Sequence, residues 1–155
     1  MISSRLFIVS ILAIAVMTFS PSSAIGQHNV TGNATGIGAS VGLVGGTGFS
    51  VRMLPASGLG YHVSGFYIKT TNEQFVSVGV EPLFVVRRTN FTTAYILGGV
   101  GYLDIKDRQR WSYGLGFGYG WRASEYVWIS TDLLLTSYNK QVLPYPQLAL
   151  HYYIW

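Results

Sequence analysis

Large apolar residues alternate with small or polar residues along most of the chain, beginning near Asn33. The clearest stretch runs from Trp111 to Arg122, where six large apolar residues occupy the odd positions and four glycines, a serine and an arginine occupy the even ones. Successive side chains of a β-strand point to opposite faces, so this stretch predicts a strand with one large, apolar face and one small face. A strand of a soluble β-sandwich would carry charged residues, and not glycines, on its second face.

Eight such runs follow one another, separated by short segments that are polar or contain glycine or proline. The predicted strands are Thr35–Val44, Thr47–Leu54, Leu59–Thr70, Phe75–Arg88, Thr93–Lys106, Trp111–Ala123, Tyr126–Tyr138 and Tyr145–Trp155. Short breaks are what β-hairpins need, and no run has a helical period over a useful length. Pro82 cannot donate to a ladder, so it predicts a bulge or bend in the fourth strand. The pattern indicates an all-β chain with up-and-down antiparallel connections.

The two faces of the runs differ in chemistry. Outside the 111–122 run, the predicted outward residues are Ile37, Ala39, Val41, Leu43, Phe49, Val51, Met53, Leu59, Tyr61, Val63, Tyr67, Val76, Val78, Val80, Phe84, Val86, Tyr95, Leu97, Leu103, Ile105, Val127, Ile129, Leu133 and Leu135. The opposite faces collect the ionisable residues Arg52, His62, Glu81, Asp104, Arg122 and Asp132. An Arg or Lys that faces hydrocarbon at the midplane costs roughly 2–4 kcal/mol. This segregation predicts an eight-stranded transmembrane β-barrel with a charge network in its lumen.

Composition favours a membrane protein over a soluble one. Charged residues make up 10% of the chain, whereas soluble domains carry about 25%. The chain has no cysteine, so no disulfide or thiolate metal site is available. The formal charge of +4 is too small and scattered to indicate a nucleic-acid partner. The three histidines, His28, His62 and His151, are far apart in sequence, so we predict no metal site and no cofactor.

The first 24 residues have the features of a signal peptide. Arg5 precedes an apolar run from Leu6 to Phe19, and Ser22, Ser23 and Ala24 are small residues suited to cleavage. A run of this length is shorter than the ~20 residues that a membrane-spanning helix needs. We therefore expect export, with residues 1–24 as signal peptide, 25–34 as a short N-terminal segment and 35–155 as the barrel.

With this leader, eight runs and an aromatic last residue, the sequence resembles the small OmpA/OmpX-type outer-membrane barrels. The resemblance is one of architecture and implies location in a bacterial outer membrane with both termini in the periplasm. It also implies that Tyr153 and Trp155 form the signal read by the barrel-assembly machinery. The final run has its apolar face at Leu148, Leu150, Tyr152 and Ile154, which places His151 and Trp155 on the inner face.

Hairpin geometry predicts which interior groups face one another. Folding the second and third strands about residue 57 places Arg52 across from His62. Folding the third and fourth about residues 72–73 places Glu81 across from Ser64. Folding the last two about residues 141–142 places Asp132 across from His151. Paired charges are what a filled barrel needs to avoid unpaired buried ions.

Two groups of residues carry candidate chemistry. His62, Ser64 and Glu81 are candidates for a base, a nucleophile and an orienting acid, a set that resembles the one used by outer-membrane lipid A deacylases. Several cations lie at or beside the predicted outer loops, where they are candidates for contact with lipopolysaccharide phosphates: Lys69, Lys106, Arg108, Arg110 and Lys140.

The leading hypothesis is a structural, non-enzymatic outer-membrane barrel that contacts lipopolysaccharide. The alternatives are a narrow pore, a lipid A-modifying enzyme and a soluble ligand-binding barrel of lipocalin type. Eight strands enclose an interior just wide enough for side chains, which opposes a sizeable channel. A lipocalin-type barrel would bury its apolar residues inside, which is the inverse of the predicted faces.

Overall fold

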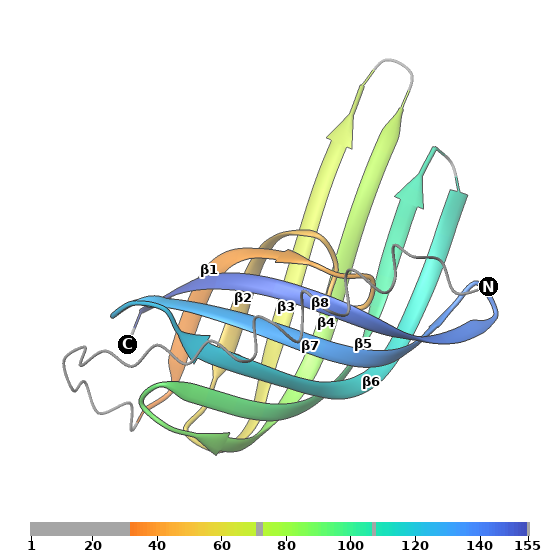
Figure 1. The fold of residues 1–155 in the computed structure, drawn as a ribbon. Coiled ribbons are helices and arrows are strands. Elements are labelled where there is room, and N and C mark those ends of the chain that lie inside the picture. The colour runs from red at the N-terminus through yellow and green to blue at the C-terminus, as the bar shows by residue number, and fades with distance from the viewer. Residues whose placement is uncertain (1–31, 71–72, 107, 155) are drawn as a thin grey trace.

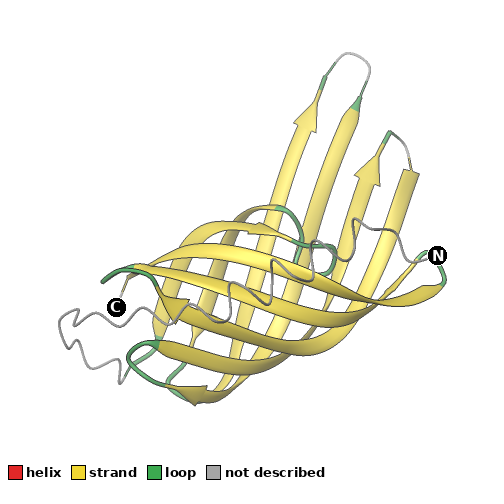
Figure 2. Cartoon of the chain, in the orientation of Figure 1, coloured by secondary structure: helices red, strands yellow, loops and turns green. Residues whose placement is uncertain are grey.

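The computed structural model describes residues 32–70, 73–106 and 108–154, so the predicted signal peptide and Trp155 lie outside the described residues. The described residues form one closed antiparallel barrel in which each strand pairs with the next and the last pairs with the first (Figure 1). The strands are β1 (Ala34–Val41), β2 (Gly48–Leu54), β3 (Gly58–Lys69), β4 (Gln74–Arg88), β5 (Thr92–Ile105), β6 (Arg108–Arg122), β7 (Val127–Tyr138) and β8 (Gln141–Ile154). Figure 2 shows strands joined by short loops. No helix in the described part of the chain is long and apolar enough to cross a membrane.

The predicted all-β, up-and-down fold is confirmed, with three strand ends shifted by three or four residues. β1 stops at Val41 rather than Val44, β6 begins at Arg108 rather than Trp111, and β8 begins at Gln141 rather than Tyr145. The predicted break at residues 139–144 included Pro144, whereas Pro146 fell within the predicted strand. Both prolines lie within β8, because β1 pairs with β8 only from Leu148 onward, which leaves the earlier part of β8 as an edge where proline is tolerated.

Pro82 does not produce the predicted bulge. The β4–β5 ladder skips Glu81 and Pro82 without a change of register, and the register shifts instead between Val85 and Arg87. A residue that cannot donate interrupts the ladder, but it requires no extra residue in the strand.

The side chains of β5 face the opposite way from the prediction. Tyr95 and Leu97 are buried inside the barrel, whereas Ile96 is exposed on the outside. Both faces of this strand carry apolar residues, so its alternation alone does not determine which face is inside. Pairing with β4 decides it, because Leu97 lies opposite the buried Leu83.

The same inversion moves Asp104 out of the predicted lumen network. Asp104 pairs in register with Val76 of β4 and Gln109 of β6, on the face that also carries the exposed Val78. It is covered there by its neighbours, and Gln74 Nε2 donates to its Oδ2 at 3.4 Å. Asp104 therefore lies on the outer face of the barrel, near the β5–β6 turn.

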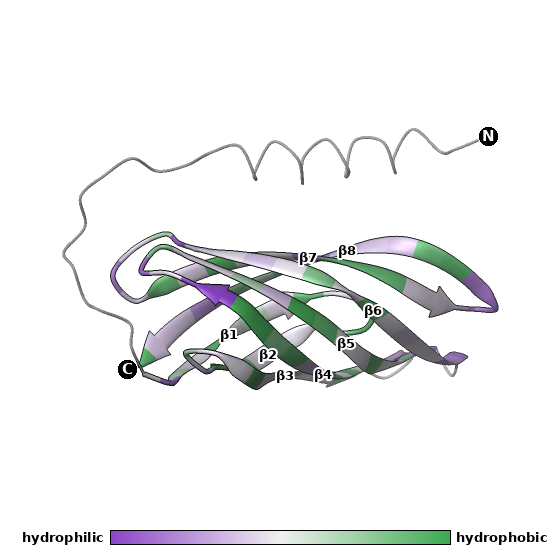
Figure 3. Cartoon of the chain, turned by 90° about the horizontal axis from the view of Figure 1, so that it is seen from below, coloured by the Kyte–Doolittle hydropathy of each residue, from purple (hydrophilic) through white to green (hydrophobic). Residues whose placement is uncertain are grey.

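Most outward-facing side chains on the other strands are apolar and exposed, as in the 111–122 run. Figure 3 shows apolar residues recurring along the strands and hydrophilic residues gathering mainly near strand ends and turns. One end of the barrel carries the β1–β2, β3–β4, β5–β6 and β7–β8 connections and is called the outer end below. The β3–β4 and β5–β6 hairpins extend well beyond the β1–β2 hairpin at this end (Figure 1).

Candidate functional site

The centre of the lumen is organised around Arg52 of β2. Its Nη2 forms an ion pair with Asp132 Oδ2 at 3.3 Å, and its Nη1 donates to Tyr95 Oη and Ser130 Oγ, each at 2.7 Å. Tyr95 in turn donates to the other carboxylate oxygen of Asp132. Arg52 and Asp132 are 1% and 2% exposed. Two opposite charges are thus buried together with most of their hydrogen-bonding capacity satisfied.

A second buried pair joins β3 and β4. His62 Nδ1 lies 2.9 Å from Glu81 Oε2, and Gln147 Nε2 of β8 donates to the other Glu81 oxygen at 2.8 Å. His151 packs edge-on against His62 with ring centroids 5.5 Å apart, and its Nε2 is 2.9 Å from Ser50 Oγ. Side chains from β2, β3, β4 and β8 therefore fill this level of the lumen.

The predicted pairings are correct in one hairpin and wrong in two. Arg52 lies opposite His62, as predicted. Glu81 lies opposite His62 and not Ser64, because the third hairpin turns one residue earlier than assumed. The pairing of Asp132 with His151 is also wrong, since the β7–β8 turn is only Asn139 and Lys140 and brings Asp132 opposite Gln147.

Arg122 is buried but lies apart from the central network. Its Nε donates to the Ser124 carbonyl at 3.1 Å and its Nη2 to the Glu125 carbonyl at 2.9 Å. The guanidinium therefore holds the β6–β7 turn at the end opposite the outer end. Tyr95 and Gln147 are network members that the sequence does not identify, because the alternation of β5 predicts Tyr95 on the outer face and because Gln147 is uncharged.

The three catalytic candidates do not form a nucleophile–base–acid chain. His62 and Glu81 are hydrogen-bonded, which matches the base and its orienting acid. The Ser64 hydroxyl, however, donates to the backbone carbonyl of Gly45 in the connection between β1 and β2, and the side chain is buried there. No group of three or more histidine, aspartate or glutamate residues in the described ranges is arranged to hold a metal ion.

The β1–β2 connection, residues 42–47, folds into the barrel and is called the inner loop. The N–H of Gly45 donates to Gln147 Oε1 at 2.7 Å, and its carbonyl accepts the Ser64 hydroxyl. Gly46 has φ 75°, which suits a glycine, where the loop turns back toward β2. Residues 42–44 therefore belong to this loop, and the prediction of strand structure for them is wrong.

The inner loop crosses to the far wall of the lumen. The Leu43 carbonyl accepts the Ser112 hydroxyl of β6 at 2.6 Å, and the N–H of Thr47 donates to Ser77 Oγ of β4 at 2.8 Å. Val44 is 1% exposed. The loop thus forms a layer on the outer-end side of the charge network, fastened by side chains of several strands.

Glycines on the inner face leave the space that this loop occupies. A Cβ on Gly79 would overlap the backbone of Gly45, and one on Gly101 would overlap the Leu43 carbonyl. A Cβ on Gly114 would lie 2.8 Å from Val44 Cγ2. The small face that alternates with the apolar face is therefore where the loop packs against the wall.

Three of the five predicted outer cations gather in one pocket at the outer end. Lys106, Arg108 and Arg110 line a cavity of about 500 Å³ together with Leu103, Ile105 and Tyr138. Arg110 Nη1 donates to Tyr138 Oη at 2.8 Å, and its guanidinium carbon lies 5.3 Å from the centre of that ring. We call this cavity the mouth pocket. Lys69 and Lys140 lie at the other two long hairpin ends, outside its lining.

No protein-family model matches the sequence, and no curated protein matches it. Among solved structures, the N-terminal β-barrel domain of Pseudomonas aeruginosa OprF is similar, with a TM-score of 0.56, 8% identity and coverage of 82% of this chain and 100% of that chain. The chain has the fold of a small outer-membrane β-barrel. Ail, the attachment invasion locus protein of Yersinia pestis, gives a TM-score of 0.48 at 14% identity, covering 79% of this chain and 96% of that chain.

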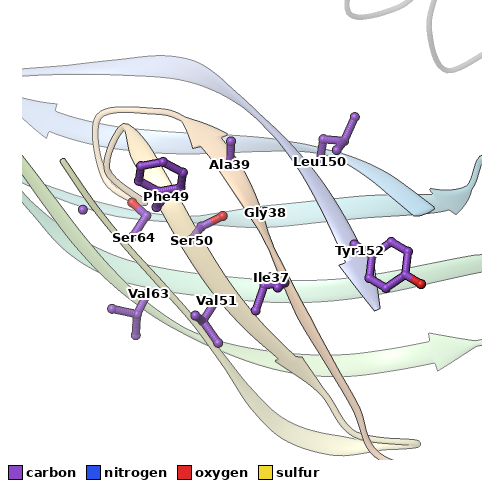
Figure 4. Close-up of a pocket in the computed structure, with 11 residues that line it drawn as sticks. Ile37, Gly38, Ala39, Phe49, Ser50, Val51, Val63, Ser64, Leu150 and Tyr152 are labelled. Carbon is purple, nitrogen blue, oxygen red and sulfur yellow. The ribbon is translucent and has the colours of Figure 1, made fainter. Parts of the chain in front are cut away.

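The outer wall of this barrel contains a shallow apolar groove. Figure 4 shows it over β1, β2, β3 and the end of β8, where Ile37, Phe49 and Tyr152 are among the side chains around it. None of the residues that line it is charged. The groove continues the apolar outer surface and carries no polar constellation of the kind found in the lumen.

Tyr153 of the predicted assembly signal faces the lumen. Its ring lies 6.1 Å from Trp128 and 5.9 Å from His151, measured between centroids, and the side chain is buried. Since Trp155 lies outside the described residues, its role in an assembly signal stays a prediction.

Proposed function

We propose that the protein is an integral outer-membrane β-barrel with a closed interior and a structural, non-enzymatic role. The observation that carries this proposal is the inverted distribution of side chains. Apolar residues such as Leu115 and Phe117 are exposed on the outer wall, while Arg52, Glu81 and Asp132 are buried inside. Soluble proteins rarely expose so large a continuous apolar surface, whereas a lipid-facing wall requires it.

Cell fractionation tests the location. The full chain, expressed in a Gram-negative host, is expected in the outer-membrane fraction after a carbonate wash, with a mobility in electrophoresis that changes on boiling. A closed barrel resists detergent until heated, which explains the shift. Recovery in the soluble fraction, or identical mobility before and after boiling, would contradict the proposal.

Substitution of Leu115 by arginine tests which surface faces lipid. Leu115 is 66% exposed and lies in the middle part of β6, between Trp111 and Trp121. An arginine at the bilayer midplane costs roughly 2–4 kcal/mol, so the free energy of unfolding in lipid vesicles is expected to fall by that amount. Urea titration followed by tryptophan fluorescence measures it.

The matched control is Ala123→Arg, which places the same charge in the exposed β6–β7 turn. There the cost is expected to be about 0–1 kcal/mol, because the charge remains in contact with water. Equal losses for the two variants would contradict a lipid-facing β6.

We also propose that cations at the outer hairpin ends contact lipopolysaccharide phosphates. Lys69 and Lys140 are exposed on two different hairpins, so their ammonium groups are free to meet separate phosphates. Added lipopolysaccharide is expected to raise the urea midpoint of the refolded barrel, and the increase is expected to be smaller in K69Q/K140Q. An undiminished increase would exclude these two lysines.

The arrangement of the lumen supports the non-enzymatic role. Ser64 is buried beneath the inner loop and is hydrogen-bonded to it, and His62 is held by Glu81. Cells that overproduce the protein are expected to keep an unchanged lipid A mass spectrum. Loss of an acyl chain that depends on His62 would replace the structural proposal with the lipid A-modifying one.

The inner loop and the charge network also oppose a pore. They fill two successive levels of a lumen that is narrow in any eight-stranded barrel. Planar bilayers that contain the protein are therefore expected to show no stable ion conductance. Reproducible single-channel steps would contradict a closed interior.

A further inference from the structure

The inner face of the barrel changes character beyond the inner loop. At the level of that loop, Ser64 and Gln147 are 3% and 4% exposed. Farther toward the outer end, the residues that face inward on the same two strands are apolar, with Ile68 at 49% and Leu143 at 50%. The inner surface at the outer end is therefore apolar and open to solvent, whereas the lumen below the inner loop is polar and filled. We call this open apolar surface the vestibule.

One side of this vestibule has no strand. The β2–β3 ladder ends at the pair Phe49–Gly65, and the β1–β8 ladder ends at Val41–Leu148. Residues 66–69 of β3 and 141–147 of β8 extend past these points without a neighbour on that side. The vestibule is accordingly open laterally as well as at its end.

The mouth pocket adds positive charge to this apolar space. Arg108 and Arg110 project inward from β6, next to Leu103 and Ile105 of β5. Arg110 is oriented by Tyr138, while Lys106 is paired with Glu73. Among the residues that the structure describes, no carboxylate forms an ion pair with either arginine, and both line the pocket together with apolar side chains.

We propose that the mouth pocket binds a single-chain anionic amphiphile of the fatty-acid type. Its carboxylate lies between Arg108 and Arg110, where a guanidinium forms charge-assisted, bidentate hydrogen bonds. Its alkyl chain packs on Leu103 and Ile105 and extends into the vestibule. The volume of about 500 Å³ falls within the usual range for small-ligand pockets, about 300–1,000 Å³. This site is distinct from the proposed lipopolysaccharide contacts at Lys69 and Lys140.

Binding is tested with the full chain refolded into phosphatidylcholine vesicles, using dansyl-labelled undecanoic acid as the probe. Energy transfer from protein tryptophan to the dansyl group is recorded and corrected with protein-free vesicles. Saturable binding is expected, and unlabelled dodecanoic acid is expected to displace the probe at least about tenfold better than dodecanol, because the alcohol lacks the anion. Probe that only partitions into the bilayer, or equal displacement by the two compounds, would overturn the proposal.

The variant R108A/R110A is expected to weaken probe binding by roughly tenfold or more, since two charge-assisted contacts are removed. Its matched control, K69A/K140A, removes the same charge from hairpin ends outside the pocket and is expected to bind normally. I105E places a carboxylate beside the alkyl chain and is expected to abolish binding. Equal affinity in R108A/R110A and the control, or normal binding in I105E, would overturn the site.

Boiling-dependent mobility is measured for every variant in these vesicles. A barrel that inserts and shifts but fails to bind refutes the fatty-acid site alone. A wild-type chain that does not insert refutes the proposed membrane function instead. The two failures are therefore distinguishable in one set of samples.

Discussion

Replacing Arg52 by methionine is expected to lower the free energy of unfolding by about 3–5 kcal/mol, because Asp132 is left as an uncompensated buried charge. The guanidinium is the group that joins Asp132, Tyr95 and Ser130 across the lumen. Urea titration of the refolded protein in lipid vesicles, followed by tryptophan fluorescence and by boiling-dependent mobility, measures the loss.

Two further variants separate charge burial from simple loss of an arginine. Arg87→Met removes an arginine that is exposed near the end of β4, so a change within about 0.5 kcal/mol is expected. The double variant R52M/D132L removes both buried charges and is expected to recover much of the stability that R52M loses. A double variant no more stable than R52M would show that the ion pair itself does not explain the loss.

Substitution of Gly79 by valine is expected to displace the inner loop from the lumen. Any Cβ at this position overlaps the backbone of Gly45, so the loop and the side chain cannot occupy the same space. Overpacking of this kind costs typically about 1–3 kcal/mol. The chain has no cysteine, so a single Val44→Cys substitution reports on the loop through its reaction with a water-soluble maleimide.

Val44 is buried, so labelling of V44C alone is expected to be slow. In the G79V background the labelling rate is expected to rise by about 5- to 150-fold. This factor corresponds to the overpacking cost of about 1–3 kcal/mol, if that cost shifts the equilibrium between the closed and the open loop. Gly65→Ala is the control, because a Cβ there would lie 3.6 Å from its nearest neighbour. Equal labelling in the G79V and G65A backgrounds would show that the loop does not depend on the space above Gly79.

The buried pair and the inner loop give the interior two layers with different roles. The charge network links β2, β5 and β7 across the lumen, beside buried apolar side chains such as Leu83 and Leu97. The inner loop covers the network from the outer end. Its Gly45 backbone is hydrogen-bonded to the side chains of Ser64 in β3 and Gln147 in β8. The mouth pocket lies beyond this loop, at the outer end of the interior.

The sequence alone determined the fold class and the faces of most strands. Leu115 and Phe117 alternate with glycines. Arg52, His62 and Asp132 alternate with apolar neighbours, so they lie on the opposite faces of their strands. Period-two alternation acts through backbone geometry, which is local, so it is readable without knowledge of any partner strand. The Arg52–His62 pairing was also predictable, because the short 55–57 turn left little freedom in the register.

The tertiary structure decided the features that depend on contacts between residues far apart in the sequence. Which face of β5 points into the barrel is determined by its register with β4, because Tyr95 and Leu97 on one face and Ile96 on the other are all apolar. The partner of Asp132 required the true length of the β7–β8 turn. The inner loop was hidden because residues 42–44 look like the continuation of a strand. Whether they pair with a neighbour or fold inward depends on the cavity left by Gly79, Gly101 and Gly114, which are distant in sequence and adjacent only in the closed barrel.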